Sequence, residues 1–232
     1  MPSWRGVVLR ADLMYRVLTR PGQLVEFPRT RTDLFDFLRP IVPQLPDIPP
    51  DLRDMHQPDA PGATVVESSE PDVARTLFTI ASLQQARRVV EVGVFRGYTS
   101  RFLAAAVAPR GGELHLVDLS QEALDIACRS AGAVTGARVA PHRGFSNAPE
   151  VLAAVPGDCD LIYLDADHSE AGVDAELAVW VPKLRPGGVV AVHDTVHYTG
   201  VCRAANRAAD RHPSVTLATS RGCGLTLIRR ED

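Results

Sequence analysis

Hydrophobic residues recur along residues 69–230 with two alternating periods, which predict helices and strands in turn. The segment 69–87 carries apolar residues at helical spacing, with Ser69 as the expected cap and Pro71 in the first turn. The apolar run RVVEVGV then has the character of a buried strand, and YTSRFLAAAVA returns to the helical pattern.

The alternation continues through the middle of the chain. Further strand candidates are ELHLVDL, ARVAPHRG, DLIYLDA and, after the expected turn RPGG, VVAVHDT, with helical segments between them. Such alternation is typical of right-handed crossovers and a parallel sheet. The runs SVTLATS and LTLIRR flank the glycine-containing turn RGCG and predict a hairpin. We therefore predict, over residues 67–232, an α/β fold with a mostly parallel sheet, helices on both faces and an antiparallel C-terminal edge hairpin.

Residues 1–66 have a different pattern. Two short amphipathic stretches, about 8–18 and 32–38, precede a segment rich in proline, which disfavours regular helix and central strand. We predict a helical N-terminal arm followed by an extended connector. A lid over the site and an exchange between the subunits of a dimer are both compatible with this pattern.

Charge and cysteine spacing narrow the choice of partner. The net charge of -3 and the lack of a basic run argue against nucleic acid and anionic membranes as ligands. The four cysteines include no CxxC pair, and no apolar run approaches the roughly 20 residues that span a bilayer. We expect a cytoplasmic protein with reduced thiols and a small-molecule partner.

Polar or glycine-rich residues follow every predicted parallel strand. In open α/β sheets, ligands bind beyond the carboxyl ends of the strands, so these clusters should share one rim. Gly93 and Gly97 let the backbone approach a ligand, but their GxxxG spacing differs from the GxGxxG of dinucleotide enzymes. Asp118 ends the second strand, where it could hold ribose hydroxyls or cap the next helix.

Three motifs in order resemble the class I S-adenosylmethionine-dependent methyltransferases. VVEVGVFRGYTS is similar to their first motif and LHLVDLS to their second. The segment from Asp160 to Thr195, DLIYLDADHSEAGVDAELAVWVPKLRPGGVVAVHDT, resembles the fourth and fifth strands of the small O-methyltransferases. The resemblance is greatest to the branch that contains catechol-type enzymes and bacterial enzymes that methylate sugars or natural products. It implies a seven-stranded Rossmann-like sheet.

The resemblance also implies the cofactor site. Glu91 and Gly93 would lie beside the methionine portion, Phe95 and Gly97 would line the loop, and Thr99 would bond the carboxylate or ammonium group. Asp118 would hold the ribose. The segment Glu67 to Glu70 would close over the cofactor. The remaining cofactor residues would be Glu67 and Ser68 in that segment, Gly144, Phe145 and Ser146, which border the adenine, and Asp165.

The catalytic residues implied by the resemblance are Asp165, His168 and Asp194. If the fourth and fifth strands are neighbours, about 4.8 Å apart, Asp165 and Asp194 share one crevice and could hold Mg²⁺. His168 would remove the acceptor proton; a helix-start surface histidine is the alternative. Catechol-type enzymes present Asp-Asn at the end of the fifth strand, whereas this chain presents His193, Asp194 and Thr195, and sugar-type relatives have an acidic residue in the place of His193. The third ligand could be His193 or Thr195. His193 could instead compensate the two aspartates itself, or a softer metal could bind.

The predicted reaction is methyl transfer to a hydroxyl of a small molecule, such as a sugar, a phenol or a natural product of secondary metabolism. A metal-independent N- or C-methyltransferase of the same fold is the first alternative. A non-catalytic cofactor-binding protein is the second. Small enzymes of this family are often dimers, so we expect a homodimer or a higher homo-oligomer.

Overall fold

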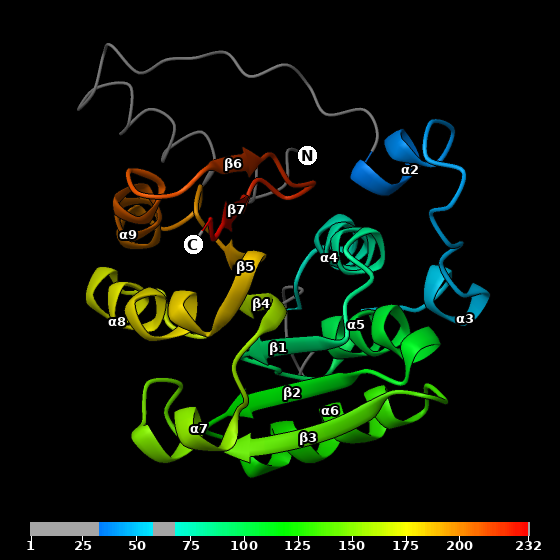
Figure 1. Cartoon of the computed structure of the whole chain (residues 1–232), viewed down its shortest axis with the longest axis horizontal. Coiled ribbons are helices and arrows are strands. Elements are labelled where there is room, and N and C mark those ends of the chain that lie inside the picture. The colour runs from blue at the N-terminus through cyan, green and yellow to red at the C-terminus, as the bar shows by residue number, and fades with distance from the viewer. Residues whose placement is uncertain (1–32, 58–67, 232) are drawn as a thin grey trace, which may run out of the picture. The chain divides into compact units, whose positions relative to one another are not determined.

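Seven strands form one sheet in the order β3-β2-β1-β4-β5-β7-β6 in the computed structural model, which describes residues 33–57 and 68–231 (Figure 1). The strands are β1 (Arg88–Val92), β2 (Glu113–Asp118), β3 (Arg138–Arg143), β4 (Cys159–Leu164), β5 (Leu184–His193), β6 (Ser214–Leu217) and β7 (Leu225–Arg229). Strands β1 to β5 are parallel, and β7 runs antiparallel to its neighbours β5 and β6. The predicted sheet and hairpin are confirmed, with the reversed strand one place in from the edge.

Of the described helices, three precede β1 and five connect successive strands. They are α2 (Leu34–Leu38), α3 (Pro50–Arg53), α4 (Pro71–Leu83), α5 (Tyr98–Val107), α6 (Gln121–Gly132), α7 (Pro149–Ala154), α8 (Glu170–Trp180) and α9 (Thr199–Ala209), with the 3₁₀ turns Ala108–Arg110 and Val181–Lys183. None of these described helices combines the length and the apolar character needed to cross a lipid bilayer.

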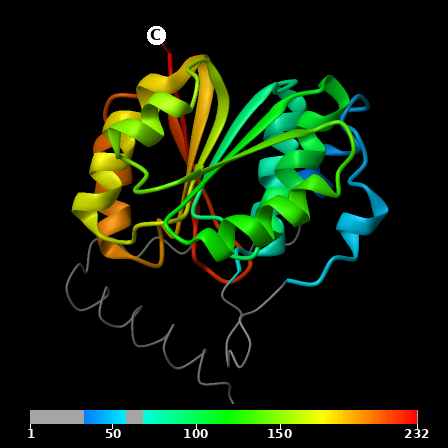
Figure 2. The same ribbon diagram turned by 90° about the horizontal axis from the view of Figure 1, so that it is seen from below.

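Helices cover both faces of the sheet (Figure 2). Apolar side chains of α4, α5 and α6, such as Leu77, Leu103 and Leu124, pack on one face, and those of α7, α8 and α9 pack on the other. Trp180 on α8 is fully buried. Because both faces are covered, the carboxyl ends of the strands remain the edge at which polar side chains can meet a ligand.

Residues 33–57 pack against α4. Phe35 lies in the same hydrophobic cluster as Phe78, with the ring centroids 6.3 Å apart, and Arg75 forms ion pairs with Asp33 and Asp36. Helix α2 matches the predicted amphipathic stretch 32–38. The other predicted helix, 8–18, lies outside the described residues.

Two local predictions were wrong. The segment RPGG is not a turn but part of β5, where Gly187, with φ +76°, donates its N–H to the carbonyl of Arg230. Glycine allows the strand to bulge there without leaving the sheet. The proline-rich connector contains the short helix α3, which is possible because Pro50 occupies its first position, where no N–H is needed.

Candidate active site

The loop after β1 is shaped by its two glycines. Gly93 has φ +84°, and a Cβ added there would lie 2.2 Å from the carbonyl oxygen of Asp165. Gly97 has φ +71° and precedes α5, and a Cβ there would lie 2.6 Å from the Cα of Ala127. The glycines therefore let the loop pack against the end of β4 and against α6, in a conformation that aims the N-terminus of α5 toward the rim.

Glu91 is a buried carboxyl group at the end of β1. Its side chain is 1% exposed, and Oε2 finds no hydrogen-bond partner among the described residues. Burial, with a smaller contribution from the charges of Asp165 and Asp118, raises its pKa well above the usual value. An unpartnered buried oxygen is costly, and a cationic ligand group would satisfy it. Thr99, in the first turn of α5, is also buried.

Asp118 holds the glycine loop in place. Its Oδ2 accepts a hydrogen bond from the N–H of Val94 at 3.0 Å, and its Oδ1 accepts one from the N–H of Ser120 at 2.8 Å. The side chain that caps α6 belongs to Ser120, not to Asp118. Because each carboxylate oxygen has a second lone pair, Asp118 can still accept bonds from ribose hydroxyls.

Apolar side chains stand exposed beside the loops after β1, β2 and β3. Phe95 is 36% exposed, Leu119 54% and Phe145 67%. Such residues suit the faces of an adenine ring. Leu119 was not predicted from the sequence, although its place directly after Asp118 could have indicated it. Gly144 has φ +154°, and the hydroxyl of Ser146 donates to Oε1 of Glu176 at 2.6 Å.

Asp165, His168 and Asp194 meet at the ends of β4 and β5. Adjacent strand tips predicted that Asp165 and Asp194 would meet, and the resemblance placed His168 beside them. Each offers a ligand atom, and these atoms all lie within 4.8 Å of one another. Nε2 of His168 lies 2.9 Å from Oδ2 of Asp194. This bond raises the pKa of His168. Burial would raise the pKa of Asp194, but the interactions with His168 and His193 outweigh it, so the pKa of Asp194 is lowered.

Asp165 accepts bonds on both oxygens. Oδ2 accepts hydrogen bonds from the hydroxyls of Ser69 at 2.9 Å and Tyr163 at 2.8 Å. Oδ1 lies 3.0 Å from Nδ1 of His193. The predicted role of Ser69 as a helix cap was therefore wrong, because α4 begins after Glu70 and the Ser69 hydroxyl turns to the active site instead. Asp167 accepts from the N–H of Ser169, and Ser169 itself caps α8.

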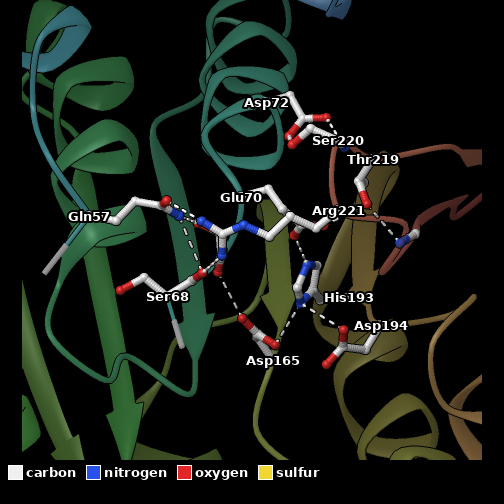
Figure 3. A network of polar contacts seen from close by, with 12 residues as sticks. Gln57, Ser68, Glu70, Asp72, Asp165, His193, Asp194, Thr219, Ser220 and Arg221 are labelled. Atoms are coloured by element: carbon white, nitrogen blue, oxygen red, sulfur yellow. Dashed lines mark hydrogen bonds and ion pairs between the residues drawn. The ribbon is translucent and has the colours of Figure 1, made fainter. Parts of the chain in front are cut away.

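His193 lies between two carboxylates (Figure 3). Nδ1 faces Asp165, and Nε2 lies 2.7 Å from Oε2 of Glu70. Burial disfavours the charged form, but Asp165, Glu70 and Asp194 outweigh it and raise the pKa of His193 well above its usual value. Thr195, the other suggested third ligand, is buried and accepts a bond from the hydroxyl of Thr226 on β7 at 2.9 Å.

The loop between β6 and β7 reaches across to the start of α4 (Figure 3). The Thr219 hydroxyl donates to Oε1 of Glu70 at 2.7 Å, and Ser220 bonds both oxygens of Asp72. Arg221 contacts the carbonyl of Ser68 and the side chain of Gln57. Ser68 thus lies under this loop, while Glu67 lies outside the described residues. The resemblance placed Glu70 in the segment that closes over the cofactor, but its bonds to His193 and Thr219 were not predicted, because these partners come from distant segments.

Comparison with known proteins supports the same reading of the fold. Residues 90–195 match a family described as a methyltransferase domain. A catechol O-methyltransferase of Niastella koreensis is 25% identical over 56% of this chain and 58% of its own length. The O-methyltransferase hkm8 of Aspergillus hancockii is 30% identical over 56% and 51%, respectively. The chain thus spans little more than half the length of these relatives.

A solved structure extends the likeness to most of the chain. The O-methyltransferase from Bacillus cereus, in complex with S-adenosylhomocysteine, superposes with a TM-score of 0.65 at 19% identity, covering 85% of this chain and 96% of its own. At this identity the likeness shows the fold. Residues 90–195 are thus similar to a methyltransferase domain, and the fold of the chain resembles that of a solved O-methyltransferase.

Proposed function

We propose that this protein transfers the methyl group of S-adenosylmethionine to a hydroxyl of a small molecule. The observation that carries the proposal is the position of the Asp165, His168 and Asp194 cluster. It adjoins the cofactor loop, because Gly93 packs against the backbone of Asp165. A methyl donor held by that loop and an acceptor held by the cluster would therefore be neighbours, as in-line displacement requires.

The cofactor site fits S-adenosylmethionine. Its positively charged methionine end suits the unpartnered oxygen of Glu91, and the free N–H groups at the start of α5 suit the carboxylate. Asp118 would accept bonds from the ribose, while Leu119 and Phe145 would cover the adenine. The cofactor supplies the methyl group and the sulfur leaving group.

His168 is proposed as the general base. One ring nitrogen faces Asp194, which would fix the ring's orientation and stabilise the positive charge that develops when the acceptor proton arrives. The His168 side chain is 40% exposed, and its ring packs on Tyr198 with the ring centroids 4.6 Å apart. Tyr198 and His197 follow β5 and are proposed to line the acceptor pocket.

Asp165 and Asp194 would hold a divalent ion. The two carboxylates fit Mg²⁺, with water and acceptor oxygens completing the shell. Bound there, the ion would lower the pKa of the acceptor hydroxyl. Among the described residues, His168 is the third donor of this cluster, and Nδ1 of His193 already bonds Asp165. The arrangement of His193 between carboxylates favours one competing mechanism, metal-independent transfer in which the imidazolium itself compensates the acidic groups.

Binding of the cofactor is the first experiment. We expect S-adenosylmethionine to bind the purified protein in calorimetry and Asp118→Ala to weaken binding by about tenfold or more, because both ribose bonds are lost. Glu122→Ala, an exposed acid on the following helix, is the control and should bind as the unchanged protein does. Equal binding by both variants would contradict the assigned ribose site.

A panel of hydroxylated acceptors then tests the chemistry. His168→Ala should lower turnover by about 10²–10⁴-fold while cofactor affinity stays within a few fold, since the base does not touch the cofactor. His212→Ala, in the turn after α9, is the matched control.

EDTA should abolish turnover and Mg²⁺ restore it; full activity after chelation would instead support the metal-independent mechanism. Methylation of amines but not hydroxyls would overturn the proposal.

Two further expectations come from the sequence: the oligomeric state from the resemblance, and the location from the cysteine spacing and the length of the apolar runs. We propose a homodimer or higher homo-oligomer, which sedimentation analysis of the purified protein can measure. The cytoplasmic location predicted from the sequence stays a prediction.

A further inference from the structure

We propose that Glu70, His193 and Cys223 form a second metal site, one that takes a transition metal of the zinc type. The three residues come from the start of α4, the end of β5 and the loop before β7. Each offers one ligand atom, a carboxylate oxygen, an imidazole nitrogen and a sulfur, and these atoms all lie within 4.8 Å of one another. None of these ligands belongs to the Asp165, His168 and Asp194 cluster.

The ligand atoms are close to the spacing that zinc needs. Bonds of about 2.0–2.3 Å in a tetrahedron place neighbouring ligand atoms roughly 3.3–3.6 Å apart. Oε2 of Glu70 and Nε2 of His193 now lie 2.7 Å apart as a hydrogen-bonded pair. Replacing the shared proton with a metal therefore requires these two groups to separate by less than about 1 Å.

The hydrogen bonds around the ligands are those of a metal site. Ligating histidines commonly donate their other ring N–H to a carboxylate, which fixes the tautomer and the ring orientation. His193 has this arrangement, with Nδ1 3.0 Å from Oδ1 of Asp165. The free oxygen of the Glu70 carboxylate, Oε1, receives the hydroxyl of Thr219 at 2.7 Å, which leaves Oε2 directed at the site. Both ligands are thus oriented before any metal arrives.

Cys223 is also held in place. It lies between Gly222 and Gly224, each with φ +81°, and its carbonyl accepts the N–H groups of Val196 at 2.8 Å and His197 at 3.1 Å. Burial, together with the carboxylates of Glu70 and Asp194, raises the pKa of its thiol, so the metal-free protein carries a neutral thiol there. A bound metal would displace that proton, as metals do from coordinating thiols.

Charge and donor type select the metal. A divalent ion with one carboxylate, one thiolate and one neutral imidazole is electrically neutral, which reduces the cost of burying it. Thiolate and imidazole suit zinc or cobalt and disfavour magnesium. Three ligands from the protein leave the fourth tetrahedral position open to solvent or to a heteroatom of a bound molecule.

Cobalt(II) is the probe, because a thiolate bound to it gives a charge-transfer absorption that oxygen and nitrogen ligands do not give. We expect one equivalent of Co²⁺ to produce this band in the metal-stripped full chain, and Zn²⁺ to displace it.

Cys223→Ser should abolish the band. Cys202→Ser, a thiol variant on α9, and Asp194→Asn, in the neighbouring cluster, should keep it. Asp165→Asn should lower the Co²⁺ affinity by about 10–100-fold, since an amide oxygen is a weaker acceptor than a carboxylate for the N–H of the ligating imidazole.

Two results would overturn the proposal: no band at saturating Co²⁺, or an undiminished band in Cys223→Ser. If the serine variant does not fold, as circular dichroism would show, Glu70→Gln replaces it. That variant should retain the thiolate band but need at least tenfold more Co²⁺; unchanged affinity would count against the site. Calorimetry with S-adenosylmethionine is measured separately, so a failure of this metal site is distinct from a failure of the proposed methyl transfer.

Discussion

Glu176 is a carboxylic acid enclosed beneath the predicted adenine site. Burial raises its pKa to about 7, with the Ser146 hydroxyl opposing the shift and the charge of Asp167 adding to it. The folded protein therefore binds one more proton than the unfolded chain between about pH 4.5 and 7. Stability should fall as the pH rises through this window, by up to about 3 kcal/mol from this group alone.

Glu176→Gln removes this dependence. The amide keeps an oxygen that accepts the Ser146 hydroxyl but cannot ionise, so the variant should be more stable than the unchanged protein at pH 8 and nearly equal to it at pH 5. Urea unfolding at both pH values measures the difference. Glu122→Gln, an exposed acid on α6, should show none. A Glu176→Gln variant that is less stable at pH 8 would mean that the charged form is favoured in the fold.

Individual site residues differ in how far the sequence predicts them. Asp165, His168 and Asp194 follow strand ends, and parallel strands bring their ends together, so their meeting could be predicted from the sequence. The meeting of Glu70 and Cys223 with His193 could not be predicted, because Glu70 comes from the start of α4 and Cys223 from the loop before β7, segments far apart in the sequence. For Ser69 the local pattern was misleading: a serine two residues before a helical proline resembles a cap, but tertiary contacts to Tyr163 and Asp165 take its hydroxyl.

At the level of elements, the turn from β1 into α5 depends on glycine. In Gly97→Ala the new Cβ would lie 2.6 Å from the Cα of Ala127 on α6. The backbone at residue 97 is also left-handed, with φ +71°. We expect a loss of about 2–4 kcal/mol in the free energy of unfolding, from backbone strain and overpacking together. Gly157→Ala, where an added Cβ meets nothing within 4 Å, should change it by less than about 0.5 kcal/mol. Similar values for both variants would contradict this account.

The position of the loop before β7 depends on contacts with the start of α4. Asp72 accepts the N–H and the hydroxyl of Ser220, each at 2.7 Å. Asp72→Ala should cost about 1–2 kcal/mol and speed amide hydrogen exchange in residues 219–224, while exchange in β1 stays slow. Asp125→Ala, an exposed acid on α6, is the control. Unchanged exchange in the loop would show that its position does not depend on this contact.

Sequence periodicity predicted whole elements better than their boundaries. Strands β1 to β5 and their connecting helices alternate strongly enough that each was predicted. The bulge at Gly187 was not predicted, because glycine pairs are common in turns, whereas here Gly187 and Gly188 form backbone hydrogen bonds with Arg230 beside the sheet. Pro141 on β3 did not disrupt the prediction, and its place on an edge strand explains why the sheet tolerates it.

At the scale of the whole molecule, the resemblance predicted a seven-stranded sheet, and the structure adds the order of its strands. The order of the last three strands also affects how the sheet is assembled, because β7 follows β6 in the chain yet lies between β6 and β5. During synthesis β6 emerges from the ribosome first but has no partner in the sheet until β7 has joined β5. The nascent protein must therefore hold an unpaired strand, and a half-built active site, until the segment after residue 224 is available.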